Sequence, residues 1–201
     1  MTDPAGLAAM ERRVGELTGL DPALVGRYRG RVGEPEILRQ IERAAGRIPS
    51  AYDAAETIPD PFPLAPVSHA PDPVLDGLAA PVTGAALSLY GTRLGWMPER
   101  PYHLLNEAVA RQWEFGRHPE SVGALRTALA MDAKVRVLVA HGLLDLVTPY
   151  LATDLLLGAI APAAGGDRVR LETFMAGHMV YTTDAGRAGL GEAARRFVFD
   201  A

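Results

Sequence analysis

Two stretches of the 201-residue sequence decide the fold: VRVLVAHGLLDLVTPY at positions 135–150 and RVRLETFMAGHMV at positions 168–180. Each begins with a short apolar run rich in β-branched residues, which predicts buried strands at Val135–Ala140 and Val169–Phe174. The segment Thr153–Ile160 between them predicts a helix. A right-handed β-α-β crossover would make the two strands parallel neighbours, so the predicted fold class is α/β.

Each predicted strand ends in a turn that carries one ionisable side chain. Asp145 follows the Gly142 turn, and His178 follows Gly177, a residue that permits positive φ. Ligands of open parallel sheets bind beyond the carboxyl ends of the strands, so we expect Asp145 and His178 to meet there. An acid followed by a histidine is also the order of the last two triad members in α/β-hydrolases. On composition alone, a turn-capping carboxylate and a half-buried histidine are the simpler interpretations.

The motifs GLLDLVTPY (142–150) and AGHMVY (176–181) resemble the serine carboxypeptidase family, which has the α/β-hydrolase fold, and particularly its bacterial members. The likeness extends from about Gly19 to Phe197 and includes four upstream segments: SAYDAAETIPDPFP, DPVLDGL, RPYHLLNEAV and RQWEFG. By this resemblance Asp145 is the triad acid and His178 the triad base. The implied function is hydrolysis of C-terminal peptide bonds through an acyl-enzyme, without a cofactor.

The nucleophilic serine of that family, in a G-E-S-Y-G-G type elbow, lies upstream of these motifs and has no counterpart here. The four serines, none of them in G-x-S-x-G, are Ser50, Ser68, Ser88 and Ser121. We therefore expect the C-terminal half of a serine carboxypeptidase, inactive by itself, whose nucleophile and oxyanion hole come from elsewhere. The alternatives are a non-catalytic binding or interaction protein and an inactive fragment derived from such an enzyme.

Met179 and Trp113 are weaker candidates for binding the peptide substrate. Met179 is placed to pack beside a substrate side chain, and Trp113 to border the specificity pocket, although ordinary packing explains either residue. His141, Asp145 and His178 would together supply two imidazoles and a carboxylate, the set of a metal facial triad. Local packing of His141 beside Gly142 is the simpler interpretation, so no metal is expected.

Residues 1–132 are predicted to form a helical, cap-like and connecting region, and residues 133–201 the β-α-β-α part of the hydrolase core. Helices are predicted at 4–18, 22–29, 35–45, 82–94, 102–111, 120–131 and 184–197, the fourth of them buried. The first two are predicted to start at the Asp-Pro pairs 3–4 and 21–22, and the last to direct Leu190, Ala193 and Phe197 inward. Seven prolines between positions 48 and 73 predict an irregular segment without sheet pairing. A plain connector is the simpler interpretation, and a segment that lines the substrate cleft is the alternative.

Charge and composition exclude several classes of partner and of site. A net charge of −4 argues against nucleic acid and a polybasic membrane role, and the absence of cysteine excludes disulfides, thiolate metal sites and a cysteine nucleophile. No signal peptide and no apolar run long enough for a membrane span are visible, so the chain is expected in the cytoplasm if Met1 is the true start. Two strands leave a sheet edge exposed. The partners that the resemblance implies are a peptide substrate and a serine-bearing N-terminal half; the exposed edge makes a second copy of the chain the alternative to that half.

Overall fold

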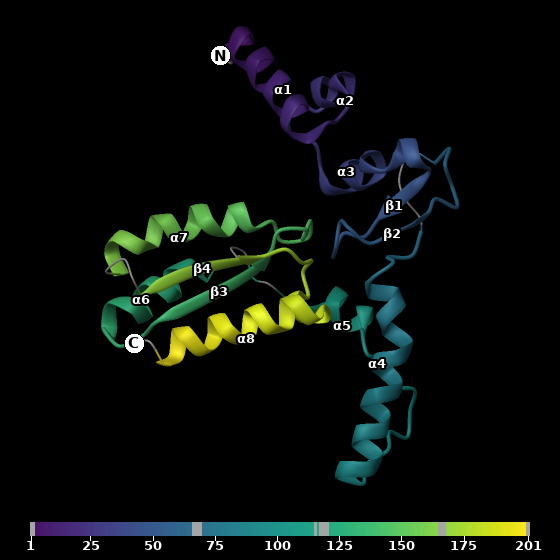
Figure 1. The fold of residues 1–201 in the computed structure, drawn as a ribbon, viewed down its shortest axis with the longest axis vertical. Helices are drawn as coiled ribbons and strands as arrows, with labels where there is room; N and C mark the ends of the chain where they lie inside the picture. The colour runs from purple at the N-terminus through teal and green to yellow at the C-terminus, as the bar shows by residue number, and fades with distance from the viewer. Residues whose placement is uncertain (1–2, 66–69, 115, 117–120, 165–167, 200–201) are drawn as a thin grey trace.

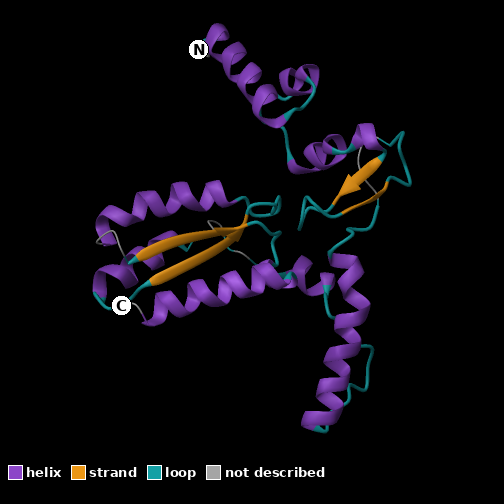
Figure 2. Ribbon diagram, viewed as in Figure 1, coloured by secondary structure: helices purple, strands orange, loops and turns teal. Residues whose placement is uncertain are grey.

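The computed structural model describes residues 3–65, 70–114, 116, 121–164 and 168–199. Within these residues the chain is mixed α/β: helices predominate, and the strands form two small sheets (Figures 1 and 2). One sheet pairs β1 with β2, and the other pairs β3 with β4. The α/β class expected from the sequence is therefore correct at this level.

The parallel sheet consists of β3 (Val137–Gly142) and β4 (Val169–Phe174), which pair from Val137 opposite Val169 to Gly142 opposite Phe174. The predicted bounds of β4 are confirmed, and so is the parallel pairing. β3 begins and ends two residues later than predicted. The connecting helix α7 (Tyr150–Ala164) is longer than the predicted helix at both ends.

Helices cover both faces of the parallel sheet (Figure 1). Helices α6 (Val122–Met131) and α7 pack on one face, where Leu129, Leu157 and Ile160 are buried. Partly buried residues of α6, of both strands and of the chain just before β3 surround them: Val122, Leu125, Val135, Val137, Val139, Val169 and Leu171. These apolar side chains form the main core, because strand residues of period two point to the same face.

Helix α8 (Asp184–Phe199) packs on the opposite face of the same sheet. Ala193 is buried, Leu190 and Phe197 are half-buried, and the guanidinium of Arg136 lies 4.4 Å from the centre of the Phe197 ring. These three residues were the ones predicted to face inward. The sheet is thus sandwiched between helices, the usual arrangement for parallel strands.

The N-terminal helices begin at Asp-Pro pairs, as predicted. Asp3 caps α1 (Pro4–Thr18), which ends at Gly19 with φ +69°, and Asp21 caps α2 (Pro22–Arg27). A carboxylate at the cap and proline in the first turn are both favourable for starting a helix. The predicted helix over 35–45 is divided into α3 (Glu34–Ile41) and a 3₁₀ turn (Arg43–Ala45).

The prediction that residues 48–73 contain no sheet pairing is wrong. β1 (Arg47–Pro49) and β2 (Thr57–Pro59) form a short antiparallel pair. Each strand places its proline at its last position, where a missing backbone donor does not interrupt the ladder. The buried Arg39 then fixes the following loop: its guanidinium donates to the Asp60 carboxylate and to the carbonyl oxygens of Phe62, Pro63 and Ala65.

The middle helices differ most from expectation. α4 (Leu75–Leu89) contains Pro81 in its interior, starts seven residues before the predicted helix, and continues as a π-helical turn (Tyr90–Leu94). None of its side chains is buried, so the prediction of a buried helix is wrong. α5 (Glu107–Gln112) begins five residues later than predicted. The predicted start of α6 at position 120 lies outside the described residues.

Two features of the described chain bear on partners. The outer edges of β3 and β4 have no strand partner among the described residues. None of the described helices combines the length and the apolar character that a membrane span requires.

Candidate active site

Asp145 and His178 come together at the carboxyl ends of β3 and β4. The Nδ1 atom of His178 lies 2.8 Å from Oδ2 of Asp145. The Asp145 side chain is almost completely buried, whereas 39% of the His178 side chain is exposed. The parallel pairing explains the meeting, because 33 residues of crossover return the chain to the same edge of the sheet.

The two carboxylate oxygens of Asp145 have different partners. Oδ1 accepts the backbone N–H groups of Val147 and Thr148, both at 2.9 Å, and Oδ2 accepts the Thr148 hydroxyl at 2.6 Å. The turn-capping interpretation and the triad interpretation of Asp145 therefore describe different oxygens of one carboxylate. Burial raises the pKa of Asp145, but the hydrogen bonds from Thr148 and from His178 outweigh it and leave the pKa lowered.

The contacts of Nδ1 fix the tautomer of His178. An ionised carboxylate only accepts hydrogen bonds, so Nδ1 carries the proton and donates it to Asp145. The Thr148 hydroxyl lies 3.2 Å from the same Nδ1, and its own hydrogen is directed to Asp145. In the neutral imidazole Nε2 is then the unprotonated nitrogen, as a general base requires.

The loop between β1 and β2, residues 50–56, is attached to both turns. Figure 1 shows this loop pointing toward the carboxyl ends of β3 and β4. Three backbone hydrogen bonds join it to the turns: Leu146 N–H to Ala51, Ala54 N–H to Leu144, and His178 N–H to Tyr52, at 3.0, 2.9 and 2.6 Å. The rings of Tyr52 and His178 also meet edge to face, with centroids 5.5 Å apart. Tyr52 is thus part of the immediate surroundings of the histidine.

Glycines permit this close approach of backbones. A Cβ atom on Gly177 would overlap the carbonyl oxygen of Tyr52, and one on Gly142 would overlap the carbonyl oxygens of Ala176 and Gly177. The sequence suggested that Gly177 serves the turn through positive φ. Gly177 is not among the glycines with positive φ, so it is needed for space and not for backbone conformation.

Ser50, at the start of the same loop, is fully buried and holds the loop to the segment before α4. Its hydroxyl lies 2.8 and 2.9 Å from the two carboxylate oxygens of Asp72, and its oxygen accepts the backbone N–H groups of Tyr52 and Asp53. These contacts make Ser50 a structural residue. Ser88 lies on α4 and Ser121 precedes α6, and no described serine hydrogen-bonds to His178; Ser68 lies outside the described residues.

The other predicted site residues do not join the pair. Met179 follows His178 in the chain and is half-buried. Trp113 caps the end of α5, is 64% exposed and lines a shallow hollow with Asn106, Val109 and Ala110. Neither residue makes a hydrogen bond or ring contact with the pair. Among the described residues no group of three potential metal ligands lies close enough to hold an ion.

Sequence reasoning missed two residues of the site. Thr148 stands three positions after Asp145, the spacing at which a capping residue meets the backbone N–H of its turn, so this signal was available. Tyr52 carried no such signal, because its backbone carbonyl makes the bond to His178 and any residue type supplies one.

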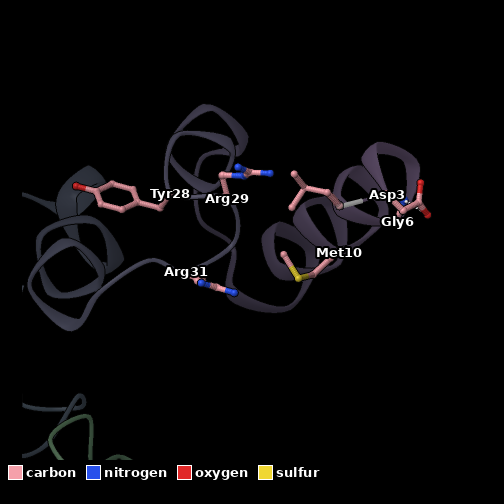
Figure 3. A pocket seen from close by; sticks show the side chains of 7 residues that line it. Asp3, Gly6, Met10, Tyr28, Arg29 and Arg31 are labelled. Carbon is pink, nitrogen blue, oxygen red and sulfur yellow. Dashed lines mark hydrogen bonds between the residues drawn. The ribbon is translucent and has the colours of Figure 1, made fainter. Parts of the chain in front are cut away.

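A separate hollow lies between α1 and the turn after α2, far along the chain from the pair (Figure 3). It encloses about 590 Å³ and is lined by Met10, Tyr28, Arg29 and Arg31, among others. In Figure 3 the guanidinium groups of Arg29 and Arg31 lie apart from each other and do not converge on one point. Neither Asp145 nor His178 lines this hollow.

No protein-family model, curated protein or solved structure matches the chain.

Proposed function

We propose that the chain supplies the acid and the histidine of a serine carboxypeptidase-type peptide hydrolase, and that its parallel sheet is part of an α/β-hydrolase core. One observation carries the proposal: Asp145 and His178 are hydrogen-bonded through Nδ1 at the carboxyl ends of adjacent parallel strands. The motifs around both residues resemble the same family, which supports it independently. No cofactor is required for this chemistry.

The geometry defines a role for each group. Nε2 of His178 would take the proton of an incoming serine hydroxyl as its oxygen attacks the scissile carbonyl. The resulting imidazolium would be stabilised by Asp145 and would return the proton to the leaving amino acid, leaving an acyl-enzyme. Water would then attack the acyl-enzyme with His178 again as base, which releases the shortened peptide and restores the serine. The serine and the oxyanion hole would come from outside these 201 residues.

The test uses the chain tagged in its source cells, recovered with any polypeptide that it is joined or bound to. A fluorophosphonate probe reports an activated serine, and release of leucine from an N-blocked Phe-Leu dipeptide reports carboxypeptidase activity. We expect both signals, with His178→Ala abolishing them and Asp145→Asn lowering turnover by roughly 10⁴-fold. The matched control is Asp154→Asn, which removes an exposed carboxylate from α7. Signals that are absent, or that persist in His178→Ala, would overturn the proposal.

A non-catalytic interaction protein is the second candidate. The observation that favours it is the exposed apolar surface, which includes Leu64, Leu94, Trp113 and Leu155, each at least 64% exposed. Such surface is typical of chains that bind a partner. Recovery of a stoichiometric partner without probe labelling or peptide release would favour this candidate over the enzyme.

A further inference from the structure

The hollow between α1 and the turn after α2 has two chemically different walls (Figure 3). Helix α1 contributes the apolar side chains of Leu7 and Met10, and the turn contributes Arg29 and Arg31. Its volume of about 590 Å³ falls within the range of roughly 300–1,000 Å³ that is usual for ligand sites. A ligand in this hollow would therefore meet an apolar surface on one side and cations on the other.

The two arginines of the hollow are not paired with acids. Arg29 and Arg31 are exposed, and within the described part of the chain neither side chain makes a hydrogen bond or an ion pair. Their segment, residues 22–33, contains three arginines and no acid. Because the two guanidinium groups lie apart in Figure 3, they suit two separate anionic groups rather than a single one.

The other ionisable groups of the lining already have partners. Both carboxylate oxygens of Asp3 accept backbone N–H groups at the start of α1, those of Ala5 and Gly6. The Tyr28 hydroxyl donates to the Glu36 carboxylate over 3.0 Å, and in Figure 3 the Tyr28 ring points away from α1. The charge that the hollow offers to a ligand is therefore mainly positive.

The backbone of the turn holds the arginines in place. Among the described residues Arg29 is the one non-glycine residue with positive φ, at +53°. Such strained conformations are concentrated at ligand-binding and other functional sites. A Cβ atom on Gly30 would lie 2.7 Å from the end of the Met10 side chain, so the turn packs directly on α1. Three backbone hydrogen bonds fix the turn, at 3.0, 2.9 and 3.0 Å: Arg29 N–H to Gly26, Gly30 N–H to Val25, and Arg31 N–H to Tyr28.

An extended peptide matches this arrangement of walls. Successive side chains of an extended chain point to opposite sides, so two acids separated by one residue would face the turn while the residue between them faces α1. A nucleic acid or polyphosphate leaves the apolar wall without a complement. Such polyanions also bind through many cations, whereas this chain has a net charge of −4.

We propose that this hollow binds an extended segment of a partner protein with the pattern acidic–apolar–acidic. The two acids would bind Arg29 and Arg31, and the apolar side chain would pack on Leu7 and Met10. The proposal goes beyond the hydrolase function and does not depend on it, because neither Asp145 nor His178 takes part.

Three short peptides test the two walls separately. They are N-acetyl-Glu-Leu-Glu-amide and two controls, in which glutamine replaces both acids or glycine replaces the leucine. Each is titrated into the ¹⁵N-labelled full chain and followed by amide chemical shifts. We expect saturable binding of the first peptide, with shifts concentrated on α1 and on residues 27–32. Each control should bind about fivefold more weakly or worse, because it loses either both ion pairs or the apolar contact.

Matched arginine variants locate the binding site. Arg29→Asn removes the cation but keeps a residue that tolerates positive φ, and Arg31→Gln removes the second cation. Each should weaken the Glu-Leu-Glu peptide by about twofold or more. Arg13→Gln removes an exposed arginine of α1 that does not line the hollow, and it should leave the affinity unchanged. Helical circular dichroism should be the same for all three variants.

Several outcomes would overturn the proposal. They are an absence of saturable binding, equal affinity for either control peptide, and an equal loss of affinity in Arg13→Gln. Inorganic tripolyphosphate is the probe for the polyanion alternative, because it carries charge without an apolar group. Shifts of the same amides by tripolyphosphate at lower concentration than by the peptide would assign the hollow to polyanions and refute the peptide site.

Discussion

His178 donates its backbone N–H to the carbonyl oxygen of Tyr52 over 2.6 Å, and the two rings meet edge to face. The contact joins the parallel sheet to a loop more than 120 positions earlier in the sequence. The imidazole is thus oriented from two directions, by the Asp145 carboxylate at Nδ1 and by the 50–56 loop at the backbone and ring. Orientation of a base by a third group is what the triad mechanism requires.

Gly177→Ala should loosen the Tyr52 contact. The added Cβ would overlap the Tyr52 carbonyl oxygen and the Asp53 side chain, so the loop has to move away from His178. We expect a loss of about 1–3 kcal/mol in the free energy of unfolding, as for other overpacked sites. Urea unfolding measures it, and the amide shifts of Tyr52 and His178 should change together.

The control for this change is Gly158→Ala. Gly158 lies inside α7 and an added Cβ would meet nothing within 4 Å. Removing glycine from a helix interior should stabilise the chain by about 0.5–1 kcal/mol. A destabilisation of equal size at both glycines would show that the Tyr52 approach is not the reason for Gly177.

Asp145→Asn should alter the acid sensitivity of the fold. The pKa of Asp145 is lowered in the folded chain, so its stabilising contribution is complete above the unfolded value of about 3.9 and is lost as pH falls through the lower folded pKa. The free energy of unfolding of the variant should be smaller at neutral pH, and the gap to the parent should narrow below about pH 3.9. Chemical denaturation at several pH values measures this, with Asp154→Asn as the exposed control. Parallel pH profiles for parent and variant would contradict it.

Thr148→Val should raise the pKa of Asp145. The variant removes the hydroxyl that donates to Oδ2 but retains the backbone N–H that donates to Oδ1. Titration of the Asp145 carboxyl carbon by NMR measures the shift. Thr148→Ser keeps the hydroxyl and should leave the titration close to that of the parent. An unchanged titration in Thr148→Val would show that the Thr148 hydroxyl does not lower the pKa of Asp145.

Substitution of Arg39 should lower the Tm far more than substitution of an exposed arginine. Arg39 is 1% exposed and satisfies one carboxylate and three carbonyl oxygens at once. Arg39→Lys keeps the charge but loses the planar fork, so we expect a clearly lower Tm, and Arg39→Met a lower one still. Arg13→Lys, in an exposed pair with Glu16, should change Tm little. Equal Tm values for Arg39→Lys and Arg13→Lys would refute the role given to Arg39.

The sequence was informative where a side-chain pattern and a turn coincide. The β-branched run at Val169–Phe174 predicted the bounds of β4, and the glycine turns predicted where Asp145 and His178 follow their strands. The Asp-Pro pairs likewise predicted the starts of α1 and α2, because a carboxylate cap and a proline act locally.

The sequence did not predict features for which tertiary contacts override local conformational preference. Prolines at 49 and 59 argued against pairing, yet each stands at a strand end where pairing tolerates it. The apolar composition of α4 predicted burial, but no other described element covers the helix. Tyr52 was missed because its bond to His178 is made by the backbone.

The solution mass of the chain should show whether the open sheet edges associate. The N–H of Val137 points to β4, so alternation along the strand directs the N–H of Ala140 to the outer edge of β3. By the same alternation the Phe174 carbonyl faces β3, and the N–H of Thr173 faces the outer edge of β4. Because two such edges and much exposed apolar surface favour pairing between chains, we expect a mass above 21.4 kDa that rises with concentration.

Light scattering behind size exclusion measures this mass. Ala140→Pro and Thr173→Pro each block one edge, so the variant that restores the monomer, with the helical circular dichroism retained, identifies the associating strand. A parent that stays monomeric at all concentrations would mean that neither edge pairs between chains.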